Sequence, residues 1–353
     1  MKDKITVILF ISYIIIFSIF HIVLKDNVIS SSERRNLTTF PKFQMDNQYV
    51  TKIDKYLLDH FPLRDEFRSI KANFNYKILK KLDNNNIYLK DNYIFKSEYP
   101  TNEKSIENFK NKILKLKSML NSNNIYMVII PDKNYYLKSN NFLNIDYDYI
   151  YNEINKLNIN NVDIRNIMKL SDYYETDTHW KQEKLDKVIK ELSKYMNFNY
   201  EEIKYNYNTY NKFYGVYYGE SAINRKPETL TYLTNDKIEN VRVEYLENSN
   251  LNKVYNISKL DGLDSYDVYL DGASSLIKIY NDNIKQTKEL IIFRDSFGSS
   301  LAPLLINYYS KITIIDNRYI NSDNIVNYVD FNNQDVLFMY STLIVNNSFS
   351  LKG

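Results

Sequence analysis

The chain has 353 residues, of which 44% are hydrophobic and 25% charged, and its formal net charge is only +3. This length can bury a large core, and the near-balanced charge argues against both general disorder and a nucleic-acid-binding surface. The chain has no Cys and three His, which excludes disulfides, thiolate metal sites and a cysteine nucleophile. We therefore predict no metal and no cofactor, and serine and carboxylate chemistry remain open.

The first predicted element is an apolar run from Ile5 to Leu24 that contains no charged residue. A run of about 20 residues is long enough to cross a bilayer. Because Lys2 and Lys4 precede it, positive charge retained inside places the N-terminus in the cytoplasm and everything after Lys25 outside. A cleaved signal peptide is the alternative, but the run exceeds the usual signal core and no A-x-A-like site follows. Residues 1–24 are thus predicted to be a cytoplasmic tip and single-pass anchor in the cell membrane.

Residues 25–100 are predicted to form a tether and an N-terminal helical arm. The polar stretch 25–45 lacks helical periodicity, whereas apolar residues recur at helical spacing over 50–81. Pro62 interrupts this second stretch, so one helix is expected to end and another to begin there. The alternating segment 86–96 is predicted to be a short hairpin.

Residues 101–353 show helices and strands in alternation, which predicts one α/β domain. Apolar residues fall on one helical face over 106–120, and an apolar run of strand length follows at 125–130. Further helices are expected at 147–157, 181–196 and 299–309, and further strands at 162–167, 290–293, 312–315 and 335–340. Residues 200–285, rich in Tyr and Asn and punctuated by Gly, interrupt the pattern and are predicted to be an inserted β-rich lobe.

A candidate nucleophile lies in the segment LIIFRDSFGSSLAPLL, where a predicted strand leads directly through Asp295 and Ser296 into a helix. A hydroxyl at the C-terminal end of a strand, beside a helix N-terminus, can be exposed while backbone N–H groups stabilise an oxyanion. The same pattern also occurs at an ordinary helix start, where Ser299 or Ser300 would be the N-cap.

A candidate base lies in YYETDTHW at residues 173–180. In an extended segment Asp177 and His179 project to the same side, so the carboxylate can orient the imidazole and stabilise its protonated form. Trp180 could form a wall of the site. The alternative interpretation is that Asp177 caps the following helix and His179 lies on the surface.

Together the two motifs resemble the DHHW family and the related alginate O-acetyltransferase-like proteins of the SGNH-hydrolase superfamily. These proteins carry an upstream D-x-H-W and a later D-S on the nucleophile turn. The resemblance spans residues 32–348 and includes these further segments: SERRNL at 32–37, FPLRDEF at 61–67, FYGVYYGESA at 213–222, YDVYLDGASSLIKI at 266–279 and DVLFMYSTLIVNNS at 335–348. It implies an SGNH-hydrolase-like α/β fold with a mostly parallel sheet flanked by helices.

The resemblance also implies a role for each motif residue. Ser296 would be the nucleophile, His179 the general base and acid, and Asp177 the residue that orients His179. The chain order Asp, His, Ser inverts the usual SGNH order and is expected of a circularly permuted member.

Four further residues are candidates for substrate binding or oxyanion stabilisation: Arg294, Trp180, Phe297 and Gly272. Arg294 occupies the place of Gly in the common G-D-S form, and a structural ion pair is the alternative role for it. The backbone around Ser296 is the expected oxyanion donor.

Two residues depart from the family pattern. Thr178 stands at the second position of D-H-H-W, which matches the D-T-H-W form of the alginate-type proteins. Ala273 stands where the resemblance leads us to expect Asn, which could donate to an oxyanion or stabilise a turn. Loss of an oxyanion donor can lower turnover by a factor on the order of 10²–10³, so an inactive or specialised member is also compatible with the sequence.

The sequence therefore favours an extracytoplasmic O-acyl transferase, with acetyl as the expected acyl group, or an esterase that acts on a cell-envelope or extracellular polysaccharide. By family analogy, a transferase would receive acyl groups from a membrane acyl-transfer protein. The alternative is a catalytically inactive surface module that binds glycans or envelope proteins. Nucleic acid is not an expected partner.

Overall fold

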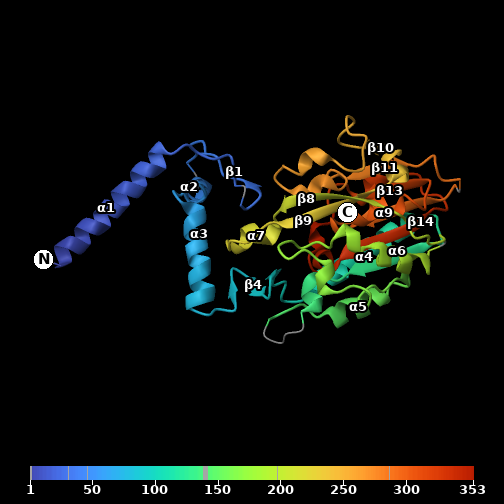
Figure 1. Cartoon of the computed structure of the whole chain (residues 1–353), viewed down its shortest axis with the longest axis horizontal. Helices are drawn as coiled ribbons and strands as arrows, with labels where there is room; N and C mark the ends of the chain where they lie inside the picture. The colour runs from blue at the N-terminus through green and yellow to red at the C-terminus, as the bar shows by residue number, and fades with distance from the viewer. Residues whose placement is uncertain (1, 31, 46, 138–141, 197, 286) are drawn as a thin grey trace. The chain divides into compact units, whose positions relative to one another are not determined.

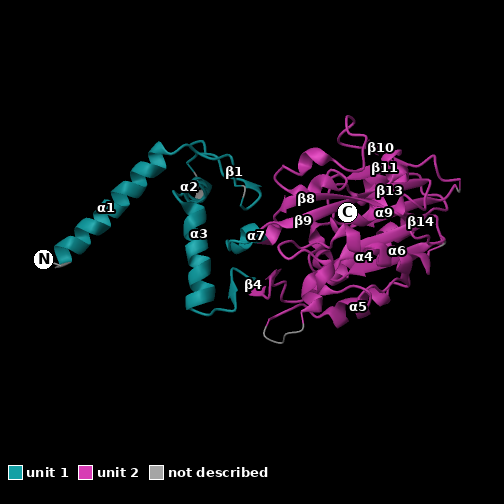
Figure 2. Ribbon diagram, in the orientation of Figure 1, with its two compact units in different colours: residues 1–87, 218–225 teal, residues 88–217, 226–353 magenta. Residues whose placement is uncertain are grey.

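The computed structural model describes residues 2–30, 32–45, 47–137, 142–196, 198–285 and 287–353. The chain divides into two compact units, which are shown in different colours in Figure 2. Unit 1 comprises residues 1–87 and 218–225, and unit 2 comprises residues 88–217 and 226–353. Each unit has its own architecture.

Unit 2 is built on a seven-stranded sheet with the strand order β10-β11-β13-β12-β14-β6-β7 (Figure 1). Its strands in chain order are β6 (Ile125–Ile130), β7 (Asn160–Asn161), β10 (Arg242–Tyr245), β11 (Leu276–Tyr280), β12 (Glu289–Arg294), β13 (Lys311–Ile315) and β14 (Asp335–Ser341). The five strands from β13 to β7 are parallel, and β11 and β10 add an antiparallel edge. This confirms the predicted α/β fold with a mostly parallel sheet.

Helices cover both faces of this sheet, because its central strands are apolar on both sides. In β6, Val128 and Ile130 belong to one hydrophobic core, whereas Met127 and Ile129 belong to the other. This alternation follows from the two-residue period of a strand. Helices α6 (Asp186–Ser193) and α9 (Phe297–Leu305) pack into the first core, and α4 (Glu103–Met119), α5 (Tyr147–Asn155), α10 (Ser322–Ile325) and α11 (Thr342–Asn346) pack into the second.

Three predicted elements differ from the structure. The strand expected at 162–167 is instead the short β7, which pairs with Tyr126 and Met127. Beyond it the chain turns, because the Asp163 carboxylate accepts the Arg165 N–H at 2.9 Å. The helix expected at 181–196 is a short 3₁₀ turn followed by α6.

The third difference concerns the lobe predicted at 200–285. Strands β8 (Asn206–Phe213) and β9 (Glu228–Thr234) do form a separate antiparallel pair. The later strands β10 and β11 instead extend the main sheet, where Leu276 pairs with Ile315. This segment therefore adds an edge to the domain, whereas the sequence predicted a separate insertion. Helices α7 (Val216–Ser221) and α8 (Asp236–Glu239) lie in the same stretch of chain.

The central strand β12 ends at Arg294 and α9 begins at Phe297. Ser296 consequently lies at the carboxyl edge of the sheet, at the place where α/β proteins commonly bind ligands.

Over its described residues, the N-terminal segment of unit 1 contains three α-helices, and the Tyr218–Ser221 part of α7 also belongs to this unit. The three helices are α1 (Lys2–Val23), α2 (Asn47–Asp59) and α3 (Arg64–Asn73), and α3 continues as a single π turn over Phe74–Ile78. Strands β1 (Ile29–Ser30) and β2 (Arg35–Asn36) pair antiparallel, while β3 (Asp83–Asn84), β4 (Ile87–Lys90) and β5 (Tyr93–Lys96) lie where the chain passes into unit 2. Helix α1 is long and apolar enough to cross a membrane, a test that a signal sequence also passes.

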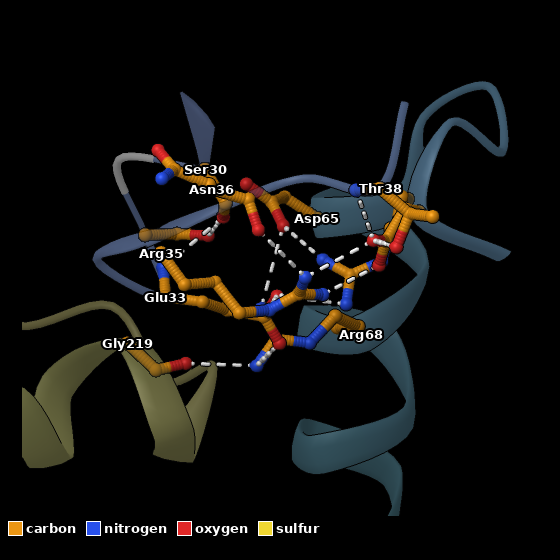
Figure 3. A network of polar contacts seen from close by, with 11 residues as sticks. Ser30, Glu33, Arg35, Asn36, Thr38, Asp65, Arg68 and Gly219 are labelled. Atoms are coloured by element: carbon orange, nitrogen blue, oxygen red, sulfur yellow. Dashed lines mark hydrogen bonds and ion pairs between the residues drawn. The ribbon is translucent and has the colours of Figure 1, made fainter. Parts of the chain in front are cut away.

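An ion-pair network holds the connections of unit 1 together (Figure 3). The Arg35 guanidinium donates to both Asp59 carboxylate oxygens, at 2.5 and 3.0 Å. Arg64 donates to Glu33 at 2.9 Å, and Arg68 donates to the Gly219 carbonyl at 2.9 Å. The hydrogen bonds from Arg35 hold the pKa of the Asp59 carboxyl well below its usual range. The segments SERRNL and FPLRDEF thus meet in one polar cluster.

Candidate active site

The turn that carries Ser296 is fixed by the residue before it. The buried Asp295 carboxylate accepts the Phe297 N–H at 3.0 Å and the Ser341 N–H at 2.8 Å. At Gly298 a Cβ atom would lie 2.6 Å from the Cβ of Arg294, so glycine allows the helix to start this close to the strand. Ser296 itself is half-buried, which leaves its hydroxyl accessible at the sheet edge.

His179 lies between the serine and a carboxylate. Its Nε2 is 2.8 Å from Ser296 Oγ, and its Nδ1 is 2.6 Å from Asp177 Oδ1. In the neutral tautomer that these partners favour, Nδ1–H donates to Asp177 and Nε2 accepts from the serine hydroxyl. The imidazole can then take the serine proton while the carboxylate stabilises the imidazolium that forms. The three residues that the sequence selected therefore lie in direct contact.

Asp177 is held by backbone donors on both of its oxygens. Oδ1 accepts the N–H of His179 at 2.9 Å, and Oδ2 accepts the N–H of Val216 at 2.8 Å. A Cβ atom at Gly215 would lie 2.2 Å from the backbone carbonyl carbon of Thr176. Only glycine therefore lets the 213–222 segment come close enough to donate to Asp177, which explains the FYG of that segment.

Glu228 holds the turn before Asp177. Its carboxylate accepts the backbone N–H groups of Glu175 and Thr176, both at 2.7 Å, and the Thr176 hydroxyl at 2.6 Å. The same Thr176 hydroxyl oxygen accepts the Gly215 N–H at 2.9 Å. No sequence pattern pointed to Glu228, because the β8–β9 pair brings it to the turn from a distant part of the chain.

Lys133 is a further residue of the site that the sequence analysis missed. It follows β6 in the run Pro131–Asp132–Lys133, and its side chain is fully buried. The ammonium group donates to the carbonyls of Tyr174, Glu175 and Asp177 at 3.1, 3.0 and 2.7 Å. Burial lowers the pKa of Lys133 to about 7. The sequence feature that could have identified it is a lysine three residues after the end of a buried strand.

Lys133 therefore ties the end of β6 to the loop that carries Asp177 and His179. The Tyr217 ring lies 5.0 Å from the ammonium group and the Phe95 ring lies 5.5 Å from it. Aromatic faces attract a desolvated cation, so these rings offset part of the cost of burying the charge.

Aromatic rings fix the plane of the catalytic imidazole. Tyr266 stacks on His179 with ring centroids 3.9 Å apart and an interplanar angle of 8°. The centroid of the Phe297 ring lies 4.9 Å from that of the imidazole. The Trp180 ring in turn packs on Phe297, with centroids 5.6 Å apart. The Tyr266 hydroxyl donates to Ser300 Oγ at 2.9 Å. His179 is thus held by ring packing as well as by hydrogen bonds.

Trp180 does not form a wall of the site, because its side chain has no exposed surface. Its indole N–H donates to the Phe297 carbonyl at 3.0 Å and to Ser300 Oγ at 2.9 Å. Trp180 thus joins the D-T-H-W loop to α9. Phe297 is also buried, so in this conformation both residues support the site and do not contact a substrate.

Arg294 forms a structural ion pair, which was the alternative role predicted for it. The guanidinium is buried and donates to Asp316 and to the Gly272 carbonyl, both at 3.2 Å. It is therefore committed to an ion pair behind the strand end. Asp316 also pairs with Arg318 at 2.6 Å.

The turn at 270–273 lies on the other side of this ion pair. Gly272 has a φ of +70°, and its N–H donates to the Tyr269 carbonyl at 3.2 Å, so this N–H is not free for an oxyanion. Ala273 is exposed and has no side-chain donor. Burial raises the pKa of the neighbouring Asp267 carboxyl to about 6. The structure therefore leaves the backbone around Ser296 as the predicted oxyanion donor on this side.

Among the residues that the structure describes, no group of three or more His, Asp and Glu side chains could hold a metal ion. The side chains of Asp177, His179 and Ser296 can perform nucleophilic attack by the serine hydroxyl on an acyl carbonyl carbon.

Comparisons with known proteins give matches among solved structures. No protein-family model and no curated protein matches the chain. A DHHW family protein from Eubacterium siraeum DSM 15702 matches with a TM-score of 0.63 and 20% identity, over 77% of this chain and 97% of that one. Bacillus cereus PatB1 with a sulfonyl adduct matches with a TM-score of 0.56 and 20% identity, over 73% and 97%.

The O-acetyltransferase domain of Pseudomonas putida AlgJ matches more distantly, with a TM-score of 0.41 and 12% identity, over 74% of this chain and 92% of that one. The first two matches confirm the resemblance to the DHHW family at the level of the fold.

Proposed function

We propose that this chain, which has the fold of a DHHW family protein, is an O-acyl transferase or esterase that acts outside the cytoplasmic membrane on a cell-envelope or extracellular polysaccharide. The observation that carries the proposal is the continuous hydrogen-bond chain from Asp177 through His179 to Ser296 at the carboxyl edge of the sheet. A serine that donates to a carboxylate-oriented imidazole is the arrangement needed for an activated nucleophile.

The reaction would proceed in two steps. Ser296 Oγ attacks the acyl carbonyl carbon while its proton passes to His179 Nε2, and the tetrahedral intermediate then expels the donor alcohol, which takes that proton. In the second step a sugar hydroxyl or water gives its proton to His179 Nε2 and attacks the acyl-serine carbonyl. The new tetrahedral intermediate breaks its bond to Ser296 Oγ, which takes the proton back from His179, and the acylated sugar or the free acid is released. Asp177 stays ionised and stabilises the imidazolium in both steps.

The aromatic surroundings of the serine bear on the choice between transfer and hydrolysis. The half-buried serine lies among buried aromatic side chains, of which Tyr266 and Phe297 pack directly on the imidazole. The two rings shield part of the imidazole from solvent and so strengthen its electrostatic contact with Asp177. A sugar hydroxyl that reaches Ser296 before water would give transfer, and water would give hydrolysis.

The apolar helix α1 supports an anchored location, with Lys2 and Lys4 on the cytoplasmic side and unit 2 outside. A protease added to intact cells is expected to digest the chain after Lys25 and leave a short anchored fragment. Full protection of the chain, in cells whose surface proteins are digested, would reverse this orientation. A membrane protein that supplies acyl groups is the corresponding partner for transfer.

The direct test uses the full-length protein in detergent with acetylated and unacetylated envelope glycans. Mass spectrometry of both glycans is expected to show acetyl gain on the acceptor, for a transferase, or acetyl loss from the donor, for an esterase. The Ser296→Ala protein is the matched control and is expected to show neither. Unchanged glycans with the wild-type protein, or equal changes with the variant, would contradict the proposal.

Ala273 favours a second candidate, a catalytically inactive module that binds glycans. In that case the wild-type and Ser296→Ala proteins would bind the polysaccharide equally and neither would change it. A sulfonyl fluoride separates the two candidates, because such reagents modify activated serine hydroxyls and Bacillus cereus PatB1 is described with a sulfonyl adduct. A Ser296 adduct would favour the enzyme.

A further inference from the structure

Unit 1 has a stripe of exposed apolar side chains along α3 and the π turn that continues it. The stripe comprises Leu63, Phe67, Ile70, Phe74 and Ile78, which are 56%, 39%, 63%, 50% and 67% exposed. They recur at spacings of four, three, four and four, so they share one face of the helix. Ala72 lies on the opposite face and is fully buried. The five stripe residues form an exposed apolar face of a kind that marks an interaction surface.

The N-terminal end of this stripe meets helix α1. The ring of Phe17, in α1, lies 5.4 Å from Phe61 with an interplanar angle of 11°, and 5.9 Å from Phe67. Phe17 lies six residues before Val23, the last residue of α1, which is about 9 Å along the helix axis at 1.5 Å per residue. If α1 spans a bilayer, these rings lie below the outer surface of the apolar layer. The stripe on α3 therefore begins at membrane depth.

The charges beside the stripe fit a lipid surface. Lys71, Lys77, Lys80 and Lys81 are all exposed, and no Asp or Glu occurs between residues 67 and 82, so the acidic side chains beside the stripe are confined to its first turn, at Asp65 and Glu66. Phe74, Ile78, Leu79 and Leu82 are exposed between and beside these lysines. Apolar side chains with lysines on their flanks are typical of helices that lie in the interface of an anionic membrane.

We infer that the α3 stripe docks into the outer leaflet of the membrane that α1 crosses, and that the four lysines contact anionic lipid headgroups. The inference rests on the proposed anchor and adds a second membrane contact to it. Aliphatic and aromatic side chains enter the acyl region, while each lysine near an anionic surface strengthens binding several-fold. The Arg35–Asp59 and Arg64–Glu33 ion pairs fix the start of α3 within unit 1.

The absence of Cys from the chain allows a clean test, because a single introduced cysteine can be labelled with an environment-sensitive fluorophore. The full chain carrying Phe74→Cys or Ile78→Cys is reconstituted into phosphatidylcholine vesicles with or without phosphatidylglycerol. Asp65→Cys, in the same helix but outside the stripe, is the matched control, and its native side chain is 54% exposed. The readout is quenching by spin-labelled lipids after vesicle flotation.

Docking predicts roughly twofold or stronger quenching at positions 74 and 78 and none at position 65. It also predicts that Lys77→Glu, Lys80→Glu and Lys81→Glu together reduce the quenching in anionic vesicles by roughly half or more. Equal quenching at all three labels, or no quenching of a chain that floats with the vesicles, would overturn the docking alone. Fluorophore protection with cross-linking to a second copy would show a protein partner and overturn it too. A chain that fails to float would overturn the docking together with the anchor.

Discussion

The two sides of the serine in unit 2 are built very differently. On the imidazole side, Asp177 accepts three hydrogen bonds and His179 joins it to Ser296 at 2.8 Å. On the side of the 270–273 turn, Ala273 has no side-chain donor and the Gly272 N–H is already paired. The first side needs many supporting contacts to hold one geometry, whereas the second leaves oxyanion stabilisation to backbone groups. Nucleophile activation and oxyanion stabilisation therefore depend on different parts of this site.

The largest effect is expected from removing the nucleophile or the base. Ser296→Ala and His179→Ala are each expected to lower the turnover of an acetyl ester by a factor of about 10⁴ or more, and the double variant to be scarcely worse, because the residues act as a unit. Steady-state rates of the three proteins provide the measurement. Additive losses in the double variant would show that the two residues do not share one step.

Asp177→Asn tests whether the carboxylate orients the imidazole. The amide cannot stabilise the imidazolium and favours the wrong tautomer, so turnover is expected to fall by a factor on the order of 10³–10⁴ with the fold retained. Asp163→Asn, at an exposed carboxylate paired with Arg165, is the control and is expected to leave the rate unchanged. Equal rates for both variants would remove Asp177 from the mechanism.

Ala273→Asn tests whether the 270–273 turn can stabilise the oxyanion. If the turn lies within reach of the oxyanion, the added amide donor is expected to raise turnover by up to about 10² with little change in KM, since it acts on the transition state. Ala273→Leu, which adds bulk without a donor, is the matched control. A similar rate for both variants would show that the turn is too far from the reacting carbonyl.

Lys133→Met is expected to have the smallest effect on rate, about tenfold, because Lys133 acts by holding the Asp177 loop. Its pH dependence is more specific. The folded pKa of about 7 lies below the ordinary value of 10.5, so between these values the unfolded chain holds a proton that the folded chain lacks. Stability should therefore rise with pH, by up to about 1.4 kcal/mol per unit. Unfolding free energies between pH 7 and 10 should lose this slope in the variant, and an unchanged slope would contradict the account.

The catalytic residues were selected by the resemblance to the DHHW family, which two short motifs carry, and the local geometry of those motifs fits the roles that the resemblance implies. The D-x-H spacing places Asp177 and His179 on one side, and a strand that leads into a helix places Ser296 at a sheet edge. Glu228 and Gly215 come from other parts of the chain, and only the tertiary fold brings them to the Asp177 loop. The motifs and the resemblance therefore predicted which residues would meet, but not which residues hold them in place.

The same distinction explains the errors in the fold. Residues 162–167 are apolar enough for a strand, but the side chain of Asp163 hydrogen-bonds the backbone and turns the chain. Strands β10 and β11 were assigned to a lobe because no sequence pattern shows that Leu276 pairs with Ile315. Trp180 was expected to form a wall of the site, but it is buried between the loop and α9, where its indole N–H donates to the Phe297 carbonyl and to Ser300 Oγ. Sequence spacing does not identify these partners.

The central claim is that His179 activates Ser296 as a nucleophile, and covalent labelling tests it most directly. Full-length wild-type protein and the His179→Ala variant are incubated with phenylmethanesulfonyl fluoride, and peptide mass spectrometry locates the adduct. The account predicts a single sulfonyl adduct on Ser296 in the wild-type protein and almost none in the variant. An unmodified Ser296 in the wild-type protein, or equal modification of Ser296 in both proteins, would contradict it.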